Sequence, residues 1–153
     1  MTLPIVLGPG EGPGVDIGTY ARCTFKATGE TTGGHFGLFE WTMGPGAFGP
    51  QPHIHKEMEE MFYVVSGEVE LNIADRTTNA QAGTFALVPR FTPHGFRNKS
   101  TERATMLIIF CPADHREKYF EGLADLSKGG RMPDAVKLVA LMKNFDSYPV
   151  TPK

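Results

Sequence analysis

The chain has 153 residues, of which 41% are hydrophobic and 21% charged, and its formal net charge is −2. This length suits one domain that can bury enough surface to fold without disulfides. The near-neutral charge argues against the basic surface that nucleic acids require, and no apolar run is long enough to cross a bilayer. We therefore expect a globular protein with no nucleic-acid partner and no membrane partner.

The first residues and the cysteines both indicate a reducing compartment. The chain begins without the charged and apolar regions of a secretory signal, so we expect a cytoplasmic protein. Cys23 and Cys111 lie far apart in the sequence. We expect two free thiols rather than a disulfide, and an inert rather than a nucleophilic Cys111.

The first third of the chain predicts a loop followed by two strands. Residues 7–15 are rich in glycine and proline, which is typical of a loop or arm. Strands are predicted at residues 19–27 and 36–43, and the second has no clearly polar face. We expect both faces of that strand to be covered. Another glycine- and proline-rich loop follows at residues 44–50.

The middle of the chain predicts short strands joined by tight turns. Residues 61–65 and 68–73 flank Ser66-Gly67, which is a strong hairpin signal. Further strands are predicted at residues 84–88, 94–98 and 104–111. Because turn signals recur about every 8–12 residues, the pattern indicates a barrel or jelly roll of roughly eight to ten strands.

The C-terminal part changes to a helical pattern. Asp114 and Glu117 have the spacing of a capping box, which predicts a helix from there to about Leu126. Pro133 predicts the start of a second helix that continues to about Asn144. The pattern therefore predicts two short helices after the last strand.

These elements predict an all-β fold, a single β-barrel followed by two short C-terminal α-helices. We place an N-terminal arm at residues 1–18, the barrel at 19–112 and a helical tail packed on the barrel at 113–153. Edge strands and strands that are apolar on both faces favour association, so we expect a homodimer.

Three histidines and one glutamate form the main candidate site. His53 and His55 are two residues apart, so on a strand both would face the same way. Glu60 follows a charged stretch that can bend at the barrel rim, and His94 lies in a second cluster. These side chains suffice to bind a divalent transition metal, and iron, nickel, cobalt, manganese, copper and zinc all remain open.

The spacing of these residues resembles the two motifs of the cupin superfamily. The first motif corresponds to Gly46, His53-Ile54-His55, Glu60 and Gly67, with four residues between His55 and Glu60. The second corresponds to Gly83, Pro89, His94 and Asn98. The resemblance covers about residues 26–120 and extends to small single-domain cupins similar to bacterial quercetinases.

The chain departs from the cupin pattern at two positions. One extra residue separates Gly46 from His53. Phe91 stands where the second motif has glycine, so the turn before His94 must form without the φ freedom of glycine. The departures concern the shape of the rim and not the set of ligands.

The resemblance implies a cupin jelly-roll barrel in which His53, His55, Glu60 and His94 bind one divalent metal ion. It implies a dioxygenase that acts on a small aromatic or enolisable hydroxy-carbonyl compound, similar to a flavonol or a polyketide. Glu60 is also the candidate catalytic residue, because it is the only one of these ligands able to leave, accept a substrate proton and return.

Two other functions remain open. One is a cupin cyclase or isomerase of a polyketide pathway, which uses the metal only as a Lewis acid. The other is a metal-binding cupin without catalysis that binds a small ligand as a sensor or store. Nothing in the sequence chooses firmly among the three functions.

Apolar, mostly aromatic, side chains are candidates for a substrate pocket, although such residues more often form plain core. The candidates are Phe36, Leu38, Phe48, Phe62, Phe85, Phe96 and Met106. Arg90 and Arg97 are candidates for binding an anionic substrate. We favour an outer-face position for Arg97 because it alternates out of phase with His94.

Overall fold

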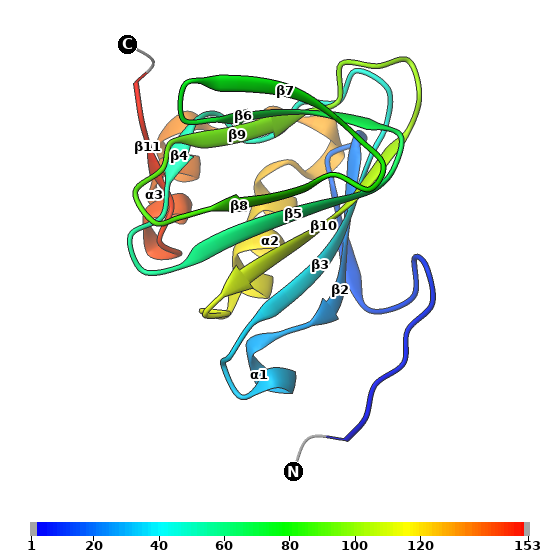
Figure 1. Cartoon of the computed structure of the whole chain (residues 1–153). Coiled ribbons are helices and arrows are strands. Elements are labelled where there is room, and N and C mark those ends of the chain that lie inside the picture. The colour runs from blue at the N-terminus through cyan, green and yellow to red at the C-terminus, as the bar shows by residue number, and fades with distance from the viewer. Residues whose placement is uncertain (1–2, 152–153) are drawn as a thin grey trace.

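In a computed structural model, two antiparallel β-sheets face each other and the two longer, C-terminal helices pack beside them (Figure 1). The structure describes residues 3–151. Sheet A contains, in spatial order, β1 (Gly14–Ile17), β2 (Ala21–Ala27), β3 (Gly37–Met43), β10 (Ala104–Cys111), β5 (Glu59–Ser66) and β8 (Phe85–Val88). Sheet B contains β11 (Tyr148–Pro149), β4 (His53–Ile54), β9 (His94–Arg97), β6 (Glu68–Ile73) and β7 (Arg76–Gln81).

The strand order confirms the predicted all-β jelly roll. Strands distant in sequence are neighbours in both sheets, as where β10 lies between β3 and β5. The two sheets keep separate hydrogen-bond ladders, so the jelly roll is a β-sandwich rather than a closed cylinder. Each sheet is therefore built from strands that lie far apart in the sequence.

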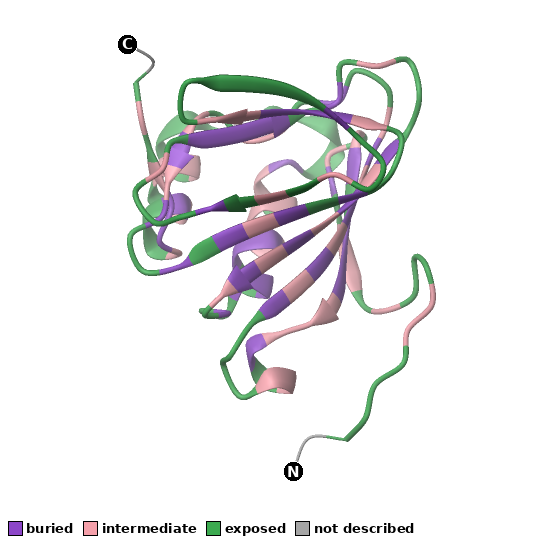
Figure 2. Cartoon of the chain, viewed as in Figure 1, coloured by how far each residue is buried: buried purple, intermediate pink, exposed green. Residues whose placement is uncertain are grey.

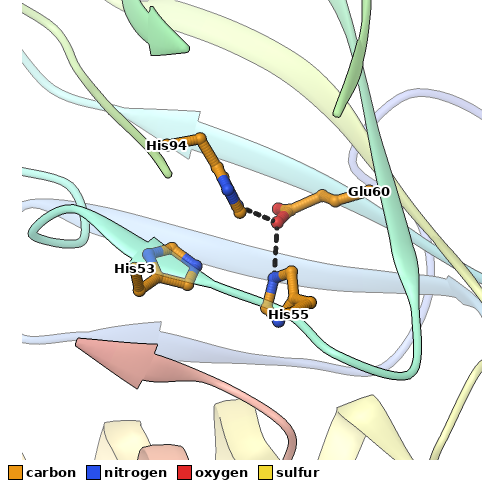
Figure 3. Close-up of side chains that lie close together, drawn as sticks. All are labelled: His53, His55, Glu60 and His94. Atoms are coloured by element: carbon orange, nitrogen blue, oxygen red, sulfur yellow. Dashed lines mark hydrogen bonds and ion pairs between the residues drawn. The ribbon is translucent and has the colours of Figure 1, made fainter. Parts of the chain in front are cut away.

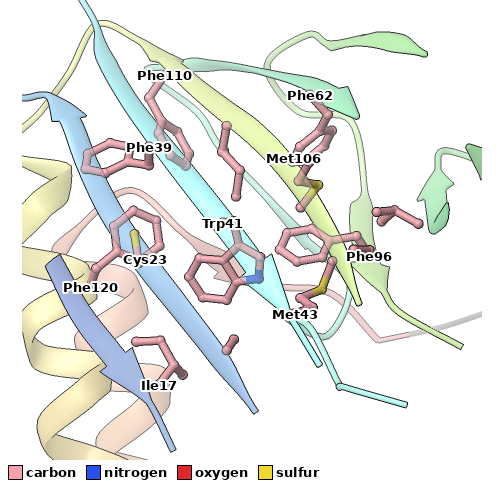
Figure 4. Close-up of a cluster of buried hydrophobic side chains, with 14 of the residues drawn as sticks. Ile17, Cys23, Phe39, Trp41, Met43, Phe62, Phe96, Met106, Phe110 and Phe120 are labelled. Carbon is pink, nitrogen blue, oxygen red and sulfur yellow. The ribbon is translucent and has the colours of Figure 1, made fainter. Parts of the chain in front are cut away.

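The core fills the space between the sheets, and strand alternation explains which residues enter it. Along β3, Phe39, Trp41 and Met43 are buried while the residues between them are partly exposed (Figure 2). Strand β10 alternates in the same way, because successive side chains of a strand point to opposite faces. The indole of Trp41 meets the ring of Phe96 from sheet B at a centroid distance of 6.0 Å (Figure 4).

Two C-terminal helices complete the core. Helix α2 (Arg116–Leu126) places Phe120 against Phe39 and Trp41 on the inner face of sheet A, with ring centroids 4.9 and 5.6 Å apart. Helix α3 (Ala135–Asn144) packs on α2 and on β11. The predicted helical tail is present. Within residues 3–151, no helix has the length and apolar character needed to cross a membrane.

The sheets extend into both segments that flank the predicted barrel. Strand β1 comes from the predicted arm and pairs with β2, and β11 comes from the C-terminal tail and pairs with β4. The polar strand β7 was not predicted. All but one of its residues are exposed at the edge of sheet B, so it lacks the alternating apolar pattern of a half-buried strand.

The start of α2 and two short turns differ from the prediction. The predicted capping box of Asp114 and Glu117 is wrong, because His115 is the N-cap of α2 and makes no side-chain capping bond. Both Asp114 and His115 have positive φ, which prevents the extended N-cap geometry that a capping box needs. Residues 29–32 form the one-turn helix α1 (Gly29–Thr32), and Lys128–Gly130 form a 3₁₀ turn. Both cysteines are free, as predicted.

Candidate metal centre

The four predicted ligands converge between the two sheets (Figure 3). Their ligating atoms all lie within 4.8 Å of one another, and all four side chains are buried. His53 on β4 is paired directly with His94 on β9. His55 lies two residues further along, and Glu60 comes from β5 of sheet A. The cluster therefore joins both sheets.

Backbone carbonyls orient each imidazole. The Nδ1 of His53 donates to the carbonyl of Gln51 and the Nδ1 of His94 to that of Thr92, each at 2.9 Å. The Nδ1 of His55 donates to the carbonyl of Asp146. Since a carbonyl only accepts, Nδ1 carries the proton in each ring and Nε2 is the atom left for a ligand.

Glu60 lies where these rings meet. Its Oε2 is 2.8 Å from Nε2 of His55 and 2.7 Å from Nε2 of His94. In neutral rings with protonated Nδ1, each Nε2 is an acceptor that faces another acceptor. The contacts are attractive only when a cation lies between the acceptors, either a proton on the ring or a metal ion. The donor set fits a divalent metal bound by His53, His55, Glu60 and His94.

Burial and mutual charge set the protonation of the cluster. Burial, together with the neighbouring His94, lowers the pKa of His53 to about 3. Burial opposes ionisation of Glu60, but His94 and His55 hold the pKa of this carboxyl well below its usual range. Burial likewise opposes the charge of His94, while the Glu60 carboxylate raises its pKa. At neutral pH, His53 is thus a neutral ligand and Glu60 an anionic one.

A loop between His55 and Glu60 is held by one carboxylate from the C-terminal segment. Asp146 accepts hydrogen bonds from the backbone N–H groups of Lys56 (2.9 Å), Glu57 (2.8 Å) and Met58 (3.1 Å). Its own carbonyl also accepts from His55. Asp146 is 7% exposed, so these bonds are largely screened from water. The C-terminal tail therefore fixes the bend that sequence analysis placed at the barrel rim.

The turn before His94 forms despite the missing glycine. Phe91 adopts a φ of +63°, the left-handed conformation that glycine favours. Its N–H donates to the carbonyl of His55 at 2.7 Å, which links the two motif segments. The Phe91 ring is 62% exposed and has no role in the core. The backbone of the turn therefore keeps the glycine geometry with a strained residue.

A cavity of about 310 Å³ opens beside the metal-ligand cluster. It lies between the inner face of sheet A and the two C-terminal helices, and most of its lining is apolar. Its lining includes His53, Glu60, Trp41, Phe110, Arg116 and Phe120. Its volume is at the lower end of the range of about 300–1,000 Å³ that is usual for ligand pockets.

Two of the seven predicted pocket residues, Phe48 and Phe96, line this cavity. Phe62 and Met106 are fully buried in the core. The other three do not line this cavity and lie on the outer side of sheet A or beyond it, where Phe36 and Leu38 border a separate hollow. Leu38 has the opposite orientation to Phe39 and Trp41 on β3, Phe36 precedes that strand and is 40% exposed, and Phe85 is 60% exposed on β8.

The two arginines considered for anion binding lie away from the cavity. Arg97 donates to Glu70 at 2.7 Å on the outer face of sheet B, as its alternation with His94 predicted. Arg90 is exposed. Neither Arg116 nor Asp146 was predicted as a site residue. Arg116 had a detectable signal, because it begins a stripe with Tyr119, Phe120 and Leu123 at helical spacing.

Comparison with known proteins finds a matching domain and a shared fold. A family model described as a cupin domain matches residues 39–110. Two solved structures share the fold: KdgF from Halomonas sp., with a TM-score of 0.62 and 18% identity over 72% of this chain and 94% of that one, and a predicted oxalate decarboxylase from Thermotoga maritima, with a TM-score of 0.65 and 15% identity over 71% and 99%. The matched residues form a cupin domain.

A curated relative of this chain is quercetin 2,3-dioxygenase from Bacillus subtilis (strain 168). The two are 32% identical over 98 residues, which are 64% of this chain and 28% of the dioxygenase. The chain spans 28% and 50% of the lengths of the two curated relatives it matches. The match supports the resemblance to quercetinase-like proteins seen in the motifs.

Proposed function

We propose that this protein is a metal-dependent dioxygenase that acts on a small aromatic or enolisable hydroxy-carbonyl compound. The observation that carries the proposal is the buried cluster of His53, His55, Glu60 and His94 at the side of an apolar cavity. The sequence match to a quercetin 2,3-dioxygenase favours an oxidative reaction over the alternatives.

The residues of the cavity have separate tasks in this proposal. Trp41, Phe96 and Phe110 bind a flat apolar ring and exclude water from the cluster. When bound, a divalent metal would act as a Lewis acid on an enolate or phenolate oxygen of the substrate. Glu60 is ionised at neutral pH and accepts the proton that the substrate hydroxyl gives up.

A comparison of two neighbouring glutamates tests this assignment. Glu60→Gln keeps the size of the side chain but removes its charge, whereas Glu59→Gln changes an exposed residue on the other face of β5. We expect oxygen uptake with flavonols and polyphenols by wild type and Glu59→Gln, and a loss of about 10²–10⁴-fold in Glu60→Gln. Elemental analysis of protein purified without added metal gives the ion and its number per chain.

The outcomes separate the three functions. Anaerobic conversion of a polyketone without oxygen uptake would support a cyclase or isomerase instead. Tight ligand binding with no turnover under any metal would support a binding protein. A Glu60→Gln variant that keeps both its metal and full turnover would rule out Glu60 as the proton acceptor. The free Cys23 and Cys111 are consistent with the proposed cytoplasmic location.

A further inference from the structure

The cavity contains a buried positive charge that the proposed metal chemistry does not use. Arg116 is 3% exposed and lines the cavity together with His53 and Glu60. Its Nη1 donates to the carbonyl of Phe145 at 2.6 Å. Its Nε is buried and has no hydrogen-bond partner among the described residues. A guanidinium carries five N–H donors, so the protein uses only a small part of its capacity.

No carboxylate forms an ion pair with this guanidinium, and Glu60, Asp146 and Asp114 act on its charge only from longer range. Within residues 3–151, none of the ion pairs includes Arg116. The guanidinium lies instead over the rings of Tyr119 and Phe110, at 4.1 and 4.5 Å from their centroids. These rings hold its plane in place but carry no negative charge. A buried charge without a counterion is destabilising, so the arrangement needs an explanation.

A second unpaired donor belongs to another residue that lines the cavity. The indole N–H of Trp41 is buried and also lacks a partner among the described residues (Figure 4). The remaining lining is largely apolar, with rings such as Phe96 and Phe120. Arg116 is the only lysine or arginine among the lining residues, so the cavity offers one positive side chain. A matching ligand has a flat apolar body, acceptor atoms and one negative charge.

We propose that Arg116 is a substrate-binding residue and that the cavity accepts an aromatic monocarboxylate, whose carboxylate the guanidinium binds through its free donors. Planar guanidinium and carboxylate groups match in a bidentate pair, and such pairs are strong where water is excluded. The inference rests on the proposed function only in taking this cavity as the substrate site. It adds that the substrate carries an acid group besides the oxygen that faces the metal ligands.

Binding of benzoate tests the proposal without any turnover. Calorimetry on the full chain, followed in parallel by fluorescence of Trp41, the single tryptophan, compares benzoate with its neutral isostere benzamide. We expect benzoate to bind wild type at least tenfold more tightly than benzamide. Arg116→Met should weaken benzoate about 10–100-fold and leave benzamide unchanged, because a hydrogen-bonded charge is removed. Arg76→Met, which changes an exposed arginine on β7, should bind benzoate like wild type.

Two further measurements distinguish a ligand-binding role from a structural one. Arg116→Lys keeps the charge but loses the planar fork, so we expect benzoate to bind it several-fold more weakly than wild type. In wild type dialysed against a chelator, the preference for benzoate should persist. Urea unfolding of Arg116→Met should show a stability equal to or above that of wild type, since an apolar residue replaces an unbalanced buried charge.

Several results would overturn the inference. These are equal affinities of wild type for benzoate and benzamide, unchanged benzoate binding in Arg116→Met or Arg116→Lys, or a preference that disappears with the metal. If Arg116→Met does not fold, the wild-type comparison and Arg116→Lys still decide. Failure of oxygen uptake alone would count against the proposed dioxygenase and would leave the binding result intact.

Discussion

Phe91 shows that a motif position can change while the backbone geometry it serves is kept. The residue has a φ of +63° and its N–H still bonds to His55, so the turn before His94 keeps its shape. An L-residue with a side chain in this conformation loses about 1–2 kcal/mol relative to the right-handed one. Glycine avoids this loss but has more freedom in the unfolded chain, which offsets about 0.5–1 kcal/mol.

We predict that Phe91→Gly stabilises the protein. The expected gain is about 0.5–1 kcal/mol in the free energy of unfolding, because the left-handed strain exceeds the entropy of glycine. Urea denaturation measures it. Phe91→Ala is the matched control, since it removes the exposed ring but keeps the Cβ that causes the strain. Equal stabilities of the glycine and alanine variants would show that the turn stores no such strain.

At the scale of elements, the C-terminal segment is part of the metal centre. Asp146 follows α3 and bonds to three successive backbone N–H groups of the loop that leads from His55 to Glu60. It has a φ of +52°, which asparagine also tolerates. Asp146→Asn therefore preserves the backbone but turns an N–H₂ group toward backbone donors.

We predict that Asp146→Asn loses about 1–3 kcal/mol of stability, the usual penalty for a buried group left without its hydrogen bond. Metal affinity should fall about 10–100-fold, because Asp146 orients the segment that carries two ligands. Urea unfolding and metal titration measure the two effects. Asp125→Asn, at an exposed position of α2, should change neither. A stable variant with unchanged metal affinity would show that the tail does not organise the loop.

A charged cluster joins neighbouring strands on the outer face of sheet B. Lys99 at 2.6 Å and Arg97 at 2.7 Å hold the pKa of Glu70 at about 2, below its ordinary value of 4.5. A carboxyl whose pKa is lower in the folded state binds protons less readily there than in the unfolded chain. Its stabilising contribution is therefore complete above pH 4.5 and is lost as the pH falls toward 2.

We predict that Glu70→Gln lowers the urea midpoint at pH 7 and that the difference from wild type shrinks as the pH falls from 4.5 to 3. Urea unfolding at several pH values checks this dependence. Glu68→Gln, on the same strand, is the control and should show no such convergence with wild type. A difference between Glu70→Gln and wild type that stays constant down to pH 3 would mean that the ion pairs do not act through Glu70 ionisation.

At the scale of the whole molecule, the sequence predicts the features that depend on local spacing, such as which side of a strand a residue faces. The i, i+2 spacing of His53 and His55 places both rings on one side of the chain, and the register of β4 with β9 sets His94 opposite His53. The register joins strands that are distant in the sequence, and hydrophobic periodicity reports only on neighbouring residues. The meeting of His53 and His94 was therefore predicted by the motif resemblance and not by periodicity. The same limit explains Asp146, whose partners lie about ninety positions away along the chain.

Side-chain direction was the harder part of the cavity to predict. Residues of β3 alternate, so Leu38 faces away from the cavity that Trp41 lines. The buried position of Arg116 was not predicted because a charged residue is expected on the exposed face of a helix. Arg116 instead occupies an inward position of α2 that an apolar residue normally fills. Residues that break the local rule for their element are often functional ones, which is consistent with the role inferred for Arg116.

The homodimer stays a prediction. We expect its interface on the outer face of sheet A. Tyr63, Val65, Phe85 and Leu87 are between 42% and 60% exposed on β5 and on β8, the edge strand of that sheet. A second copy related by a twofold axis would cover both the apolar side chains and the unpaired edge. We expect a dimer mass by light scattering at micromolar concentration and a monomer mass for Leu87→Lys. A wild-type monomer would refute the dimer.

The metal centre should also stabilise the molecule as a whole, because its ligands come from β4 and β9 of sheet B and β5 of sheet A. A metal that binds only the folded state adds about 2.7 kcal/mol at a free concentration of 100 times its Kd. For a chain of this size, we expect chelation to lower the Tm by roughly 5–10 °C. Calorimetry with and without chelator measures the shift.

His94→Gln should show little response to the chelator, whereas His35→Gln, at an exposed histidine, should respond like wild type. Equal Tm values for wild type with and without chelator would mean that the four side chains bind no metal that stabilises the folded state.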